Sequence, residues 1–269
     1  MPAMTTLIIG ATGKTGRRIM ERLDGRDVRP GSRATGFEWN DRSTWAPTLE
    51  GIDAAYISYY PDIAVEGAAD TIGAFSQLAA AHGVKRLVLL SGRGVPEAQR
   101  AEQELIAAGT EWTVVRCSWF AQNFSEAFML EGVLAGELAL PAGDVPEPFV
   151  DVEDIADVAT AALTQDGHHG RIYELTGPRA LTFEQVAAEI TSATGQLVRF
   201  VPVPGDAFHA GMLEAGVPAD EAEIVSFLFR EVLDGRNAEP QDGVRRALGR
   251  APRDFGEYAR ATAAAGVWA

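Results

Sequence analysis

The stretch TTLIIGATGKTGRR, at residues 5–18, places three glycines and one lysine between an apolar run and a helical pattern. The apolar run, residues 6–9, ends at Gly10, and apolar residues then recur at helical spacing between Ile19 and Leu23. This order predicts a strand, a glycine turn and a helix. The backbone N–H groups at the start of such a helix, together with its dipole, favour a bound phosphate.

Two kinds of phosphate-binding turn compete for this pattern. A nucleotide-hydrolysing P-loop has four residues between its first glycine and the Gly-Lys-Thr triplet, which places that glycine at Ile8, inside the strand. The glycines fall instead at Gly10, Gly13 and Gly16, a variant of the dinucleotide fingerprint. We expect Gly13 to adopt a positive φ and to leave room for a pyrophosphate. The structural alternative is a glycine turn without a ligand.

Composition limits the classes of protein that fit. The chain has 269 residues, 46% of them hydrophobic, which is enough for one large α/β domain with a lobe. Its net charge of −15 disfavours nucleic acid and anionic membranes as partners. No apolar run reaches the ~18 residues of a membrane span. The single cysteine, Cys117, excludes an internal disulfide and ends an apolar run, so we expect a buried thiol in a cytoplasmic protein without a signal peptide.

Strands and helices alternate along the first two thirds of the chain. Apolar runs predict strands at residues 28–32, 54–58, 87–90, 112–117 and 171–175, and helical periodicity predicts helices at 66–82, 97–108 and 152–163. This alternation predicts an α/β fold, a Rossmann-type doubly wound parallel sheet covered by helices, over residues 1–176. Residues 177–269 are mostly helical in pattern, with a short strand near 197–203, and we expect them to form a smaller substrate-binding lobe.

The end of the second predicted strand carries information on the cofactor. A fold that binds NAD usually places Asp or Glu there, about 20 residues after the glycines, for the ribose 2′-hydroxyl. The stretch VRPGSRATG, at residues 28–36, has no carboxylate and offers Ser32 and Arg33 instead. Arginine matches a phosphate with directed donors, so the pattern favours the 2′-phosphate of NADP. The alternative is that Arg33 is a solvated surface charge.

Five stretches together resemble one family: GATGKTGR, VRPGSR, FEWNDRSTW, RLVLLSGRG and WTVVRCSWFAQNFSE. Their combination is similar to the NmrA-like atypical short-chain dehydrogenases, among them the ergot-alkaloid dehydrogenases and the azoreductase and quinone-reductase-like members. The resemblance is strongest over the first 175 residues or so, and PFVDVEDIADVA at residues 148–159 also fits it. It implies NADP binding with the nicotinamide near the third, fourth and fifth strand ends. The predicted cofactor contacts are Gly10, Thr12, Gly13, Lys14, Thr15, Gly16, Ser32, Arg33, Ser58 and Ser91.

One departure from short-chain dehydrogenases concerns the proton donor. Those enzymes use Tyr-x-x-x-Lys, and none of the five tyrosines here has a lysine four residues later. The helix that would carry the pair reads PEAQRAEQEL, at residues 96–105. Hydride transfer is the chemistry of the cofactor, and a strong electrophile accepts hydride with little help from an acid. An iminium ion, a quinone or a conjugated enone therefore fits better than a plain ketone.

Polar and aromatic side chains after the third, fourth and fifth strands are the candidates for chemistry. Tyr59, Tyr60 and Ser91 are the candidate catalytic hydroxyls, and Trp119, Phe120 and Asn123 are candidate substrate contacts. Each has a structural alternative. Strand-end tyrosines often only pack, a serine often bonds only to backbone, and Phe120 with Phe124 has the spacing of core residues on one helix face.

The sequence therefore predicts an NADPH-dependent reductase of a small cyclic or aromatic electrophile. One alternative is an NADP(H)-binding regulator of the NmrA type that senses redox state without turnover. An isomerase or epimerase that recycles the hydride is disfavoured by the missing Tyr-Lys pair. We expect no metal site, because the adjacent His168 and His169 have no third ligand near them in sequence. The pattern makes no prediction of oligomeric state.

Overall fold

A computed structural model of the protein describes residues 4–269, and the chain divides into two compact units. The first comprises residues 1–117, 152–175 and 242–250, and the second comprises 118–151, 176–241 and 251–269. The division thus crosses the chain several times rather than once after residue 176. Residues 118–151 belong to the second unit, and residues 242–250 return to the first.

The first unit is built on a six-stranded sheet in the order β2-β1-β3-β4-β5-β7, with every neighbouring pair parallel. The strands are β1 (Thr6–Ile9), β2 (Val28–Gly31), β3 (Ala54–Ile57), β4 (Arg86–Gly92), β5 (Glu111–Cys117) and β7 (Arg171–Leu175). The predicted doubly wound Rossmann-type fold is confirmed. The chain passes from β2, on one side of β1, to β3 on the other. The point at which the strand order reverses, the topological switch point, therefore lies at the carboxyl end of β1.

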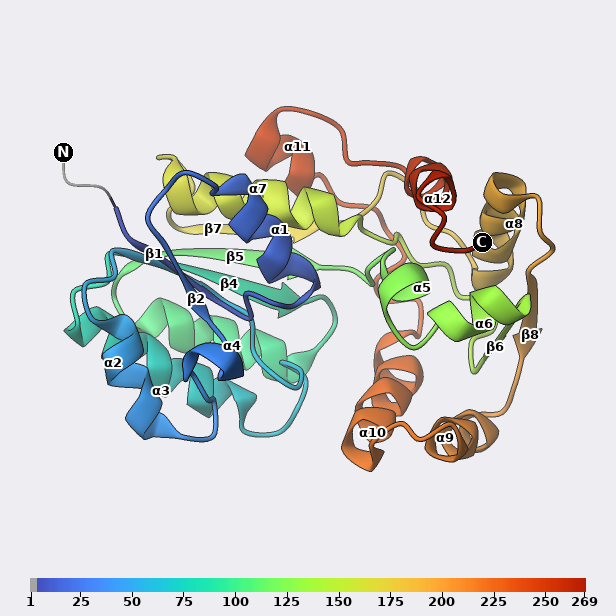
Figure 1. Cartoon of the computed structure of the whole chain (residues 1–269), viewed down its shortest axis with the longest axis horizontal. Helices are drawn as coiled ribbons and strands as arrows, with labels where there is room; N and C mark the ends of the chain where they lie inside the picture. The colour runs from blue at the N-terminus through green and yellow to red at the C-terminus, as the bar shows by residue number, and fades with distance from the viewer. Residues whose placement is uncertain (1–3) are drawn as a thin grey trace. The chain divides into compact units, whose positions relative to one another are not determined.

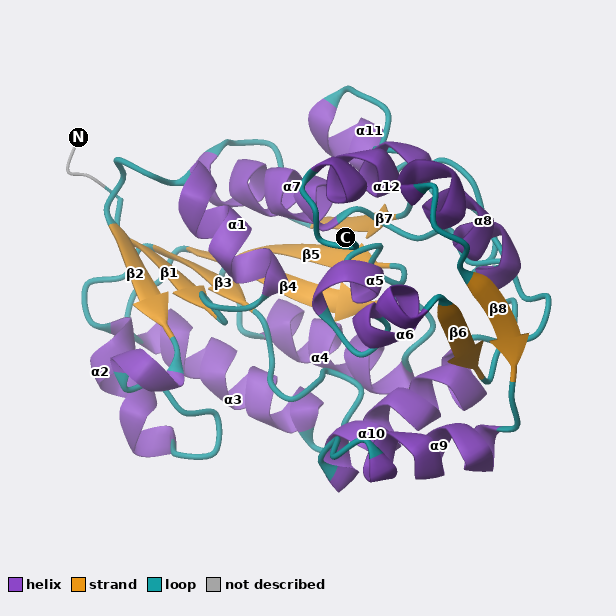
Figure 2. Cartoon of the chain, turned by 45° about the vertical axis from the view of Figure 1, so that its right-hand side comes forward, coloured by secondary structure: helices purple, strands orange, loops and turns teal. Residues whose placement is uncertain are grey.

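Helices cover both faces of this sheet, as Figures 1 and 2 show. On one face lie α1 (Lys14–Arg22), α7 (Val152–Thr164) and α11 (Gly243–Leu248). On the other lie α2 (Trp45–Leu49), α3 (Ala68–Ala81) and α4 (Pro96–Ala107). Strands β1 and β3 are buried along their whole length. That burial explains why they read as short continuous apolar runs rather than as alternating ones. Cys117 is buried as expected, and burial raises the pKa of its thiol.

The second unit has its own core and a two-stranded parallel sheet of β6 (Glu137–Leu140) and β8 (Arg199–Pro202). Its helices are α5 (Asn123–Glu126), α6 (Leu130–Ala135), α8 (Phe183–Thr194), α9 (Gly205–Glu214), α10 (Ala219–Phe227) and α12 (Phe255–Ala264), with a π-helical turn, η3, at Leu228–Val232. The strand predicted near residues 197–203 is therefore present. Its partner β6, with the sequence ELAL, was not predicted. No helix among residues 4–269 is both long and apolar enough to cross a membrane.

Candidate functional site

The glycine turn lies between β1 and α1, and its three glycines differ in backbone conformation and in the space around them. Gly10 has a φ of 77°, which favours glycine, and a Cβ there would lie 3.0 Å from the Cβ of Ser58. A Cβ on Gly16 would lie 2.1 Å from the backbone oxygen of Gly10, so this residue permits the close approach of helix to strand. The expectation of a positive φ at Gly13 was wrong: its φ is −75°, and it is the N-cap of α1.

The space beside Gly13 fits a phosphate-bearing cofactor. Apart from its neighbours in the chain and the backbone of α1, the only described atom within 4 Å of a Cβ built on Gly13 is the backbone oxygen of Gly10, at 3.2 Å. Gly13 is exposed at the start of a nine-residue helix, where the first N–H groups have no acceptor within the helix itself. The residues present therefore fit a pyrophosphate, which would occupy a place that any larger side chain at this position would fill.

The tight 3₁₀ turn η1 (Arg33–Thr35), directly after β2, presents Arg33. The hydroxyl of Thr35 donates to the backbone oxygen of Pro30 at 2.9 Å and accepts from the backbone N–H of Ser32 at 2.9 Å. These bonds fix the backbone of the turn, while the side chain of Arg33 stays exposed. The end of β2 thus offers one cation, Arg33, and the hydroxyls of Ser32 and Thr35.

Two adjacent tyrosines follow the end of β3, and their surroundings differ. Tyr59 is half-buried, and its ring centroid lies 4.9 Å from that of Trp39. Tyr60 is 62% exposed, and the guanidinium carbon of Arg33 lies 5.1 Å from its ring centroid. Only Tyr60 is therefore brought together with a predicted cofactor residue. Ser58, before them, lies against Gly10.

The end of β4 holds Ser91 in a buried ionic network. Ser91 is 3% exposed, and its hydroxyl donates to Glu102 of α4 at 2.5 Å. Glu102 also accepts from Arg116 of β5, at 2.9 Å from Nε, and Arg116 donates in turn to Glu174 of β7 at 2.7 Å. The hydrogen bonds that Arg116 donates to Glu102, and further those that it donates to Glu174, raise the pKa of Arg116. The hydroxyl proton of Ser91 is thus directed at a carboxylate of the protein.

Sequence reasoning did not identify Glu102 and Arg116 as partners of Ser91. One signal was available. Arg116 is a charged residue within the apolar run WTVVRC, and a charge inside a buried strand requires a partner. A second contact was also missed. The buried hydroxyl of Tyr56, in β3, donates to Thr15 of the glycine turn at 2.9 Å. Thr15 can therefore serve a phosphate through its backbone N–H while its hydroxyl braces the turn.

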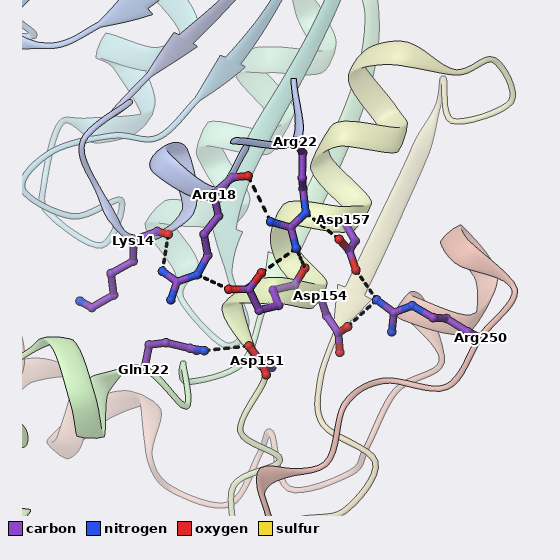
Figure 3. A network of polar contacts seen from close by, with 9 residues as sticks. Lys14, Arg18, Arg22, Gln122, Asp151, Asp154, Asp157 and Arg250 are labelled. Atoms are coloured by element: carbon purple, nitrogen blue, oxygen red, sulfur yellow. Dashed lines mark hydrogen bonds and ion pairs between the residues drawn. The ribbon is translucent and has the colours of Figure 1, made fainter. Parts of the chain in front are cut away.

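An ionic cluster joins α7 to α1 and to Arg250, which follows α11 (Figure 3). Arg18 and Arg22 donate to Glu153 at 2.5 and 2.6 Å, and Arg22 also donates to Asp157 at 2.6 Å. From α11's end, Arg250 donates to Asp157 and to the fully buried Asp154, at 2.5 and 2.7 Å. Glu153 and Asp157 of α7 thus have arginine partners on α1, the helix that follows the glycine turn, and Asp154 pairs with Arg250.

The predicted substrate contacts all lie in the second unit. Trp119 is half-buried and its ring lies 4.8 Å from that of Phe229 in η3. Phe120 forms an isolated parallel bridge with Val150, and Asn123 begins α5. Phe124, by contrast, is fully buried in the core of this unit. Across residues 4–269, no group of three or more His, Cys, Asp or Glu side chains could hold a metal ion.

A parallel six-stranded sheet with a glycine turn at its switch point defines the class of Rossmann-type NAD(P)-binding proteins. The chain is 32% identical to an uncharacterized oxidoreductase of Bacillus subtilis, over 96% of this chain and 95% of that protein. It is 31% identical to an agroclavine dehydrogenase of Claviceps fusiformis, over 95% of this chain and 96% of that protein. A structure of a Citrobacter triphenylmethane reductase complexed with NADP(H) matches the fold with a TM-score of 0.80 at 18% identity, covering 97% of this chain and 100% of that one.

No protein-family model matches the chain. The similarity to the Bacillus subtilis oxidoreductase and to the agroclavine dehydrogenase nevertheless extends over nearly the whole length at more than 30% identity. The chain belongs to the NmrA-like atypical short-chain dehydrogenases/reductases, and it is an oxidoreductase.

Proposed function

We propose that this protein is an NADPH-dependent reductase that transfers hydride to a small cyclic or aromatic electrophile of the iminium, quinone or enone type. The observation that carries the cofactor assignment is Arg33, exposed at the end of β2 where NAD-binding folds usually place a carboxylate. A guanidinium there suits a 2′-phosphate and has no acceptor to offer a free 2′-hydroxyl.

The proposed cofactor site follows three neighbouring strand ends. The glycine turn after β1 would hold the pyrophosphate, and Ser32 and Arg33 after β2 would hold the 2′-phosphate. Ser58 after β3 and Ser91 near the end of β4 complete the proposed contacts. When bound, NADPH would supply the hydride, and the protein would supply its orientation and the surrounding charge.

The hydroxyls near these strand ends support an electrophile that needs little acid assistance. The proton of Ser91 is directed at Glu102, and Tyr59 packs against Trp39. Helix α4, where short-chain dehydrogenases carry Tyr-x-x-x-Lys, has neither tyrosine nor lysine. An iminium carbon accepts hydride without a new proton on nitrogen, and a quinone or enone delocalises the charge it gains. Trp119, Phe120 and Asn123 remain the proposed substrate contacts.

The reaction is tested by the loss of NADPH absorbance in the presence of quinones, cyclic iminium compounds, enones and azo dyes. We expect oxidation of NADPH with at least one of these electrophiles, and slower oxidation with simple ketones. Tight NADPH binding without oxidation by any member of the panel would overturn the proposal and favour a redox-sensing regulator of the NmrA type.

The cofactor preference is tested by Arg33→Ala. A charge-assisted hydrogen bond contributes ~1.5–3 kcal/mol, so NADPH affinity should fall roughly 10- to 150-fold while NADH affinity changes little. Ser32→Ala should act in the same direction by less, since a neutral hydroxyl makes a weaker bond. Calorimetric dissociation constants for both dinucleotides measure the ratio. An unchanged ratio in Arg33→Ala would mean that Arg33 is a surface charge.

A further inference from the structure

The contact between Arg33 and Tyr60 joins two strand ends that lie on opposite sides of the glycine turn. Arg33 follows β2 and Tyr60 follows β3, and both strands pair with β1. The guanidinium carbon lies 5.1 Å from the centroid of the Tyr60 ring, within the ~6 Å at which a cation and an aromatic face attract each other. The pair therefore spans the carboxyl end of β1.

The exposure of Tyr60 calls for an explanation. Its side chain is 62% exposed, whereas the adjacent Tyr59 packs into an aromatic cluster with Trp39. An exposed tyrosine contributes little to the core, and its ring face is instead covered by Arg33. The packing of Tyr59 anchors the segment from which Tyr60 projects, and the bonds of Thr35 anchor the turn from which Arg33 projects.

The planar shape of the guanidinium determines what this contact leaves available. The Tyr60 ring lies on one side of the guanidinium, and a group with five N–H donors keeps several of them available on its other sides. Arg33 can therefore contact Tyr60 and still donate to a phosphate. The contact also restricts a side chain that is otherwise rich in rotamers, so less entropy is lost when the phosphate binds.

We propose that Tyr60 is a positioning residue that holds the guanidinium of Arg33 for the 2′-phosphate of NADP, and thereby contributes to the preference for NADPH over NADH. This inference rests on the proposed cofactor preference. It assigns the aromatic ring of Tyr60, and not its hydroxyl, as the functional part of the side chain. If Tyr60 were catalytic instead, its hydroxyl and not its ring would be the functional part.

Two substitutions separate the ring from the hydroxyl. Tyr60→Leu removes the aromatic face, and Tyr60→Phe keeps it and removes only the hydroxyl. An exposed cation–π contact is equivalent to ~0.5–1 kcal/mol, or roughly a two- to fivefold change in affinity. We expect Tyr60→Leu to weaken NADPH by about that factor and to leave NADH unchanged. Tyr60→Phe should retain the wild-type ratio of the two dissociation constants.

Combining Tyr60→Leu with Arg33→Ala tests whether Tyr60 acts through Arg33. Because the ring has nothing to position once the guanidinium is gone, the double variant should bind NADPH as weakly as Arg33→Ala alone. Calorimetry with NADPH and NADH is the readout, and circular dichroism verifies folding. A wild-type ratio in Tyr60→Leu, or additive losses in the double variant, would overturn the role of Tyr60. A wild-type ratio in Arg33→Ala would instead overturn the cofactor proposal itself.

Discussion

Two glycines of the glycine turn, three positions apart, differ in the space that a side chain would have, and we expect them to serve binding and folding separately. A Cβ on Gly16 would overlap the backbone oxygen of Gly10 at 2.1 Å, so the lack of a side chain there is a packing requirement. A Cβ on Gly13 would meet that same oxygen at 3.2 Å and is otherwise directed into open space. Packing therefore explains why residue 16 is a glycine. It does not explain the glycine at position 13, where a bound ligand would.

Substitution of each glycine separates the two roles. Gly13→Val has a permissive φ of −75°, so the protein should fold, but the branched side chain should fill the place of the pyrophosphate and abolish dinucleotide binding. Gly16→Ala should instead lower the free energy of unfolding by roughly 1–3 kcal/mol, because the backbone of the turn must shift. Calorimetry and thermal unfolding measure the two effects. Wild-type NADPH affinity in a folded Gly13→Val variant would contradict this assignment.

At the level of single residues, the sequence predicted the positions of functional groups better than their contacts. The strands near whose ends Ser32, Tyr60 and Ser91 lie were predicted, because apolar runs mark them, but β4 continues to Gly92, so Ser91 lies inside this strand and not after it. The partners were not predicted. Glu102 and Arg116 are 14 residues apart and meet only because α4 packs beside β5, and Arg33 meets Tyr60 only across the order β2-β1-β3.

At the level of elements, α1 is held in place by charge as well as by packing. Burial acts to raise the pKa of Glu153, but the hydrogen bonds from Arg22 and Arg18 outweigh it, so the pKa lies below its usual value. The same ion pairs with Glu153 and Asp157 raise the pKa of Arg22 against the opposing effect of burial. Because α1 presents its N-terminus to the phosphate-binding turn, this cluster fixes the direction of that N-terminus.

The lowered pKa of Glu153 makes its contribution to stability dependent on pH. In the unfolded chain a glutamate titrates near 4.3, so the stabilisation is complete above that pH and is lost as the pH falls through the lower, folded-state pKa. Its side chain is 36% exposed, so solvent screening limits the effect to ~1 kcal/mol.

Glu153→Gln should therefore lower the free energy of unfolding at pH 7 by ~1 kcal/mol, and the difference from wild type should shrink below pH ~4.3. Glu21→Gln, at an exposed carboxylate of the same helix α1, is the matched control and should change little. Urea unfolding at several pH values measures both variants. An equal loss for Glu153→Gln at pH 7 and pH 3.5 would show that the ion pairs carry none of the effect.

For the whole molecule, the sequence predicted the architecture of the first unit but not the division of the chain. The parallel sheet was recoverable because its strands are buried on both faces and alternate with periodic helices. Residues 118–151 lie in the second unit, where Phe149 of this segment packs with Phe183 and Phe255 in a core that local patterns do not show. The contacts that define a unit are non-local, and the chain returns to the first unit at residues 242–250.

Across the whole chain, each of the five tyrosines has a structural contact that accounts for it. Tyr59 packs against Trp39 and Tyr60 against Arg33. The hydroxyls of the other three bond to protein groups: Tyr56 to Thr15, Tyr173 to His168 and Tyr258 to Ser125. Burial raises the pKa of these three, which is opposite to the shift that a lysine gives the tyrosine of a Tyr-x-x-x-Lys pair.

This distribution predicts that no single hydroxyl is indispensable for reduction of an iminium or quinone. Tyr59→Phe, Tyr60→Phe and Ser91→Ala should each lower kcat by less than the ~10²–10⁴-fold that removal of a general acid or base produces. Any loss in Ser91→Ala should reflect the buried Glu102, which then lacks one donor, and Ser91→Thr should restore it. Steady-state kinetics with NADPH and the best electrophile of the panel provide the measurement. A loss of kcat beyond 100-fold in one variant, with KM and NADPH affinity unchanged, would identify a dedicated proton donor and show that the substrate requires one.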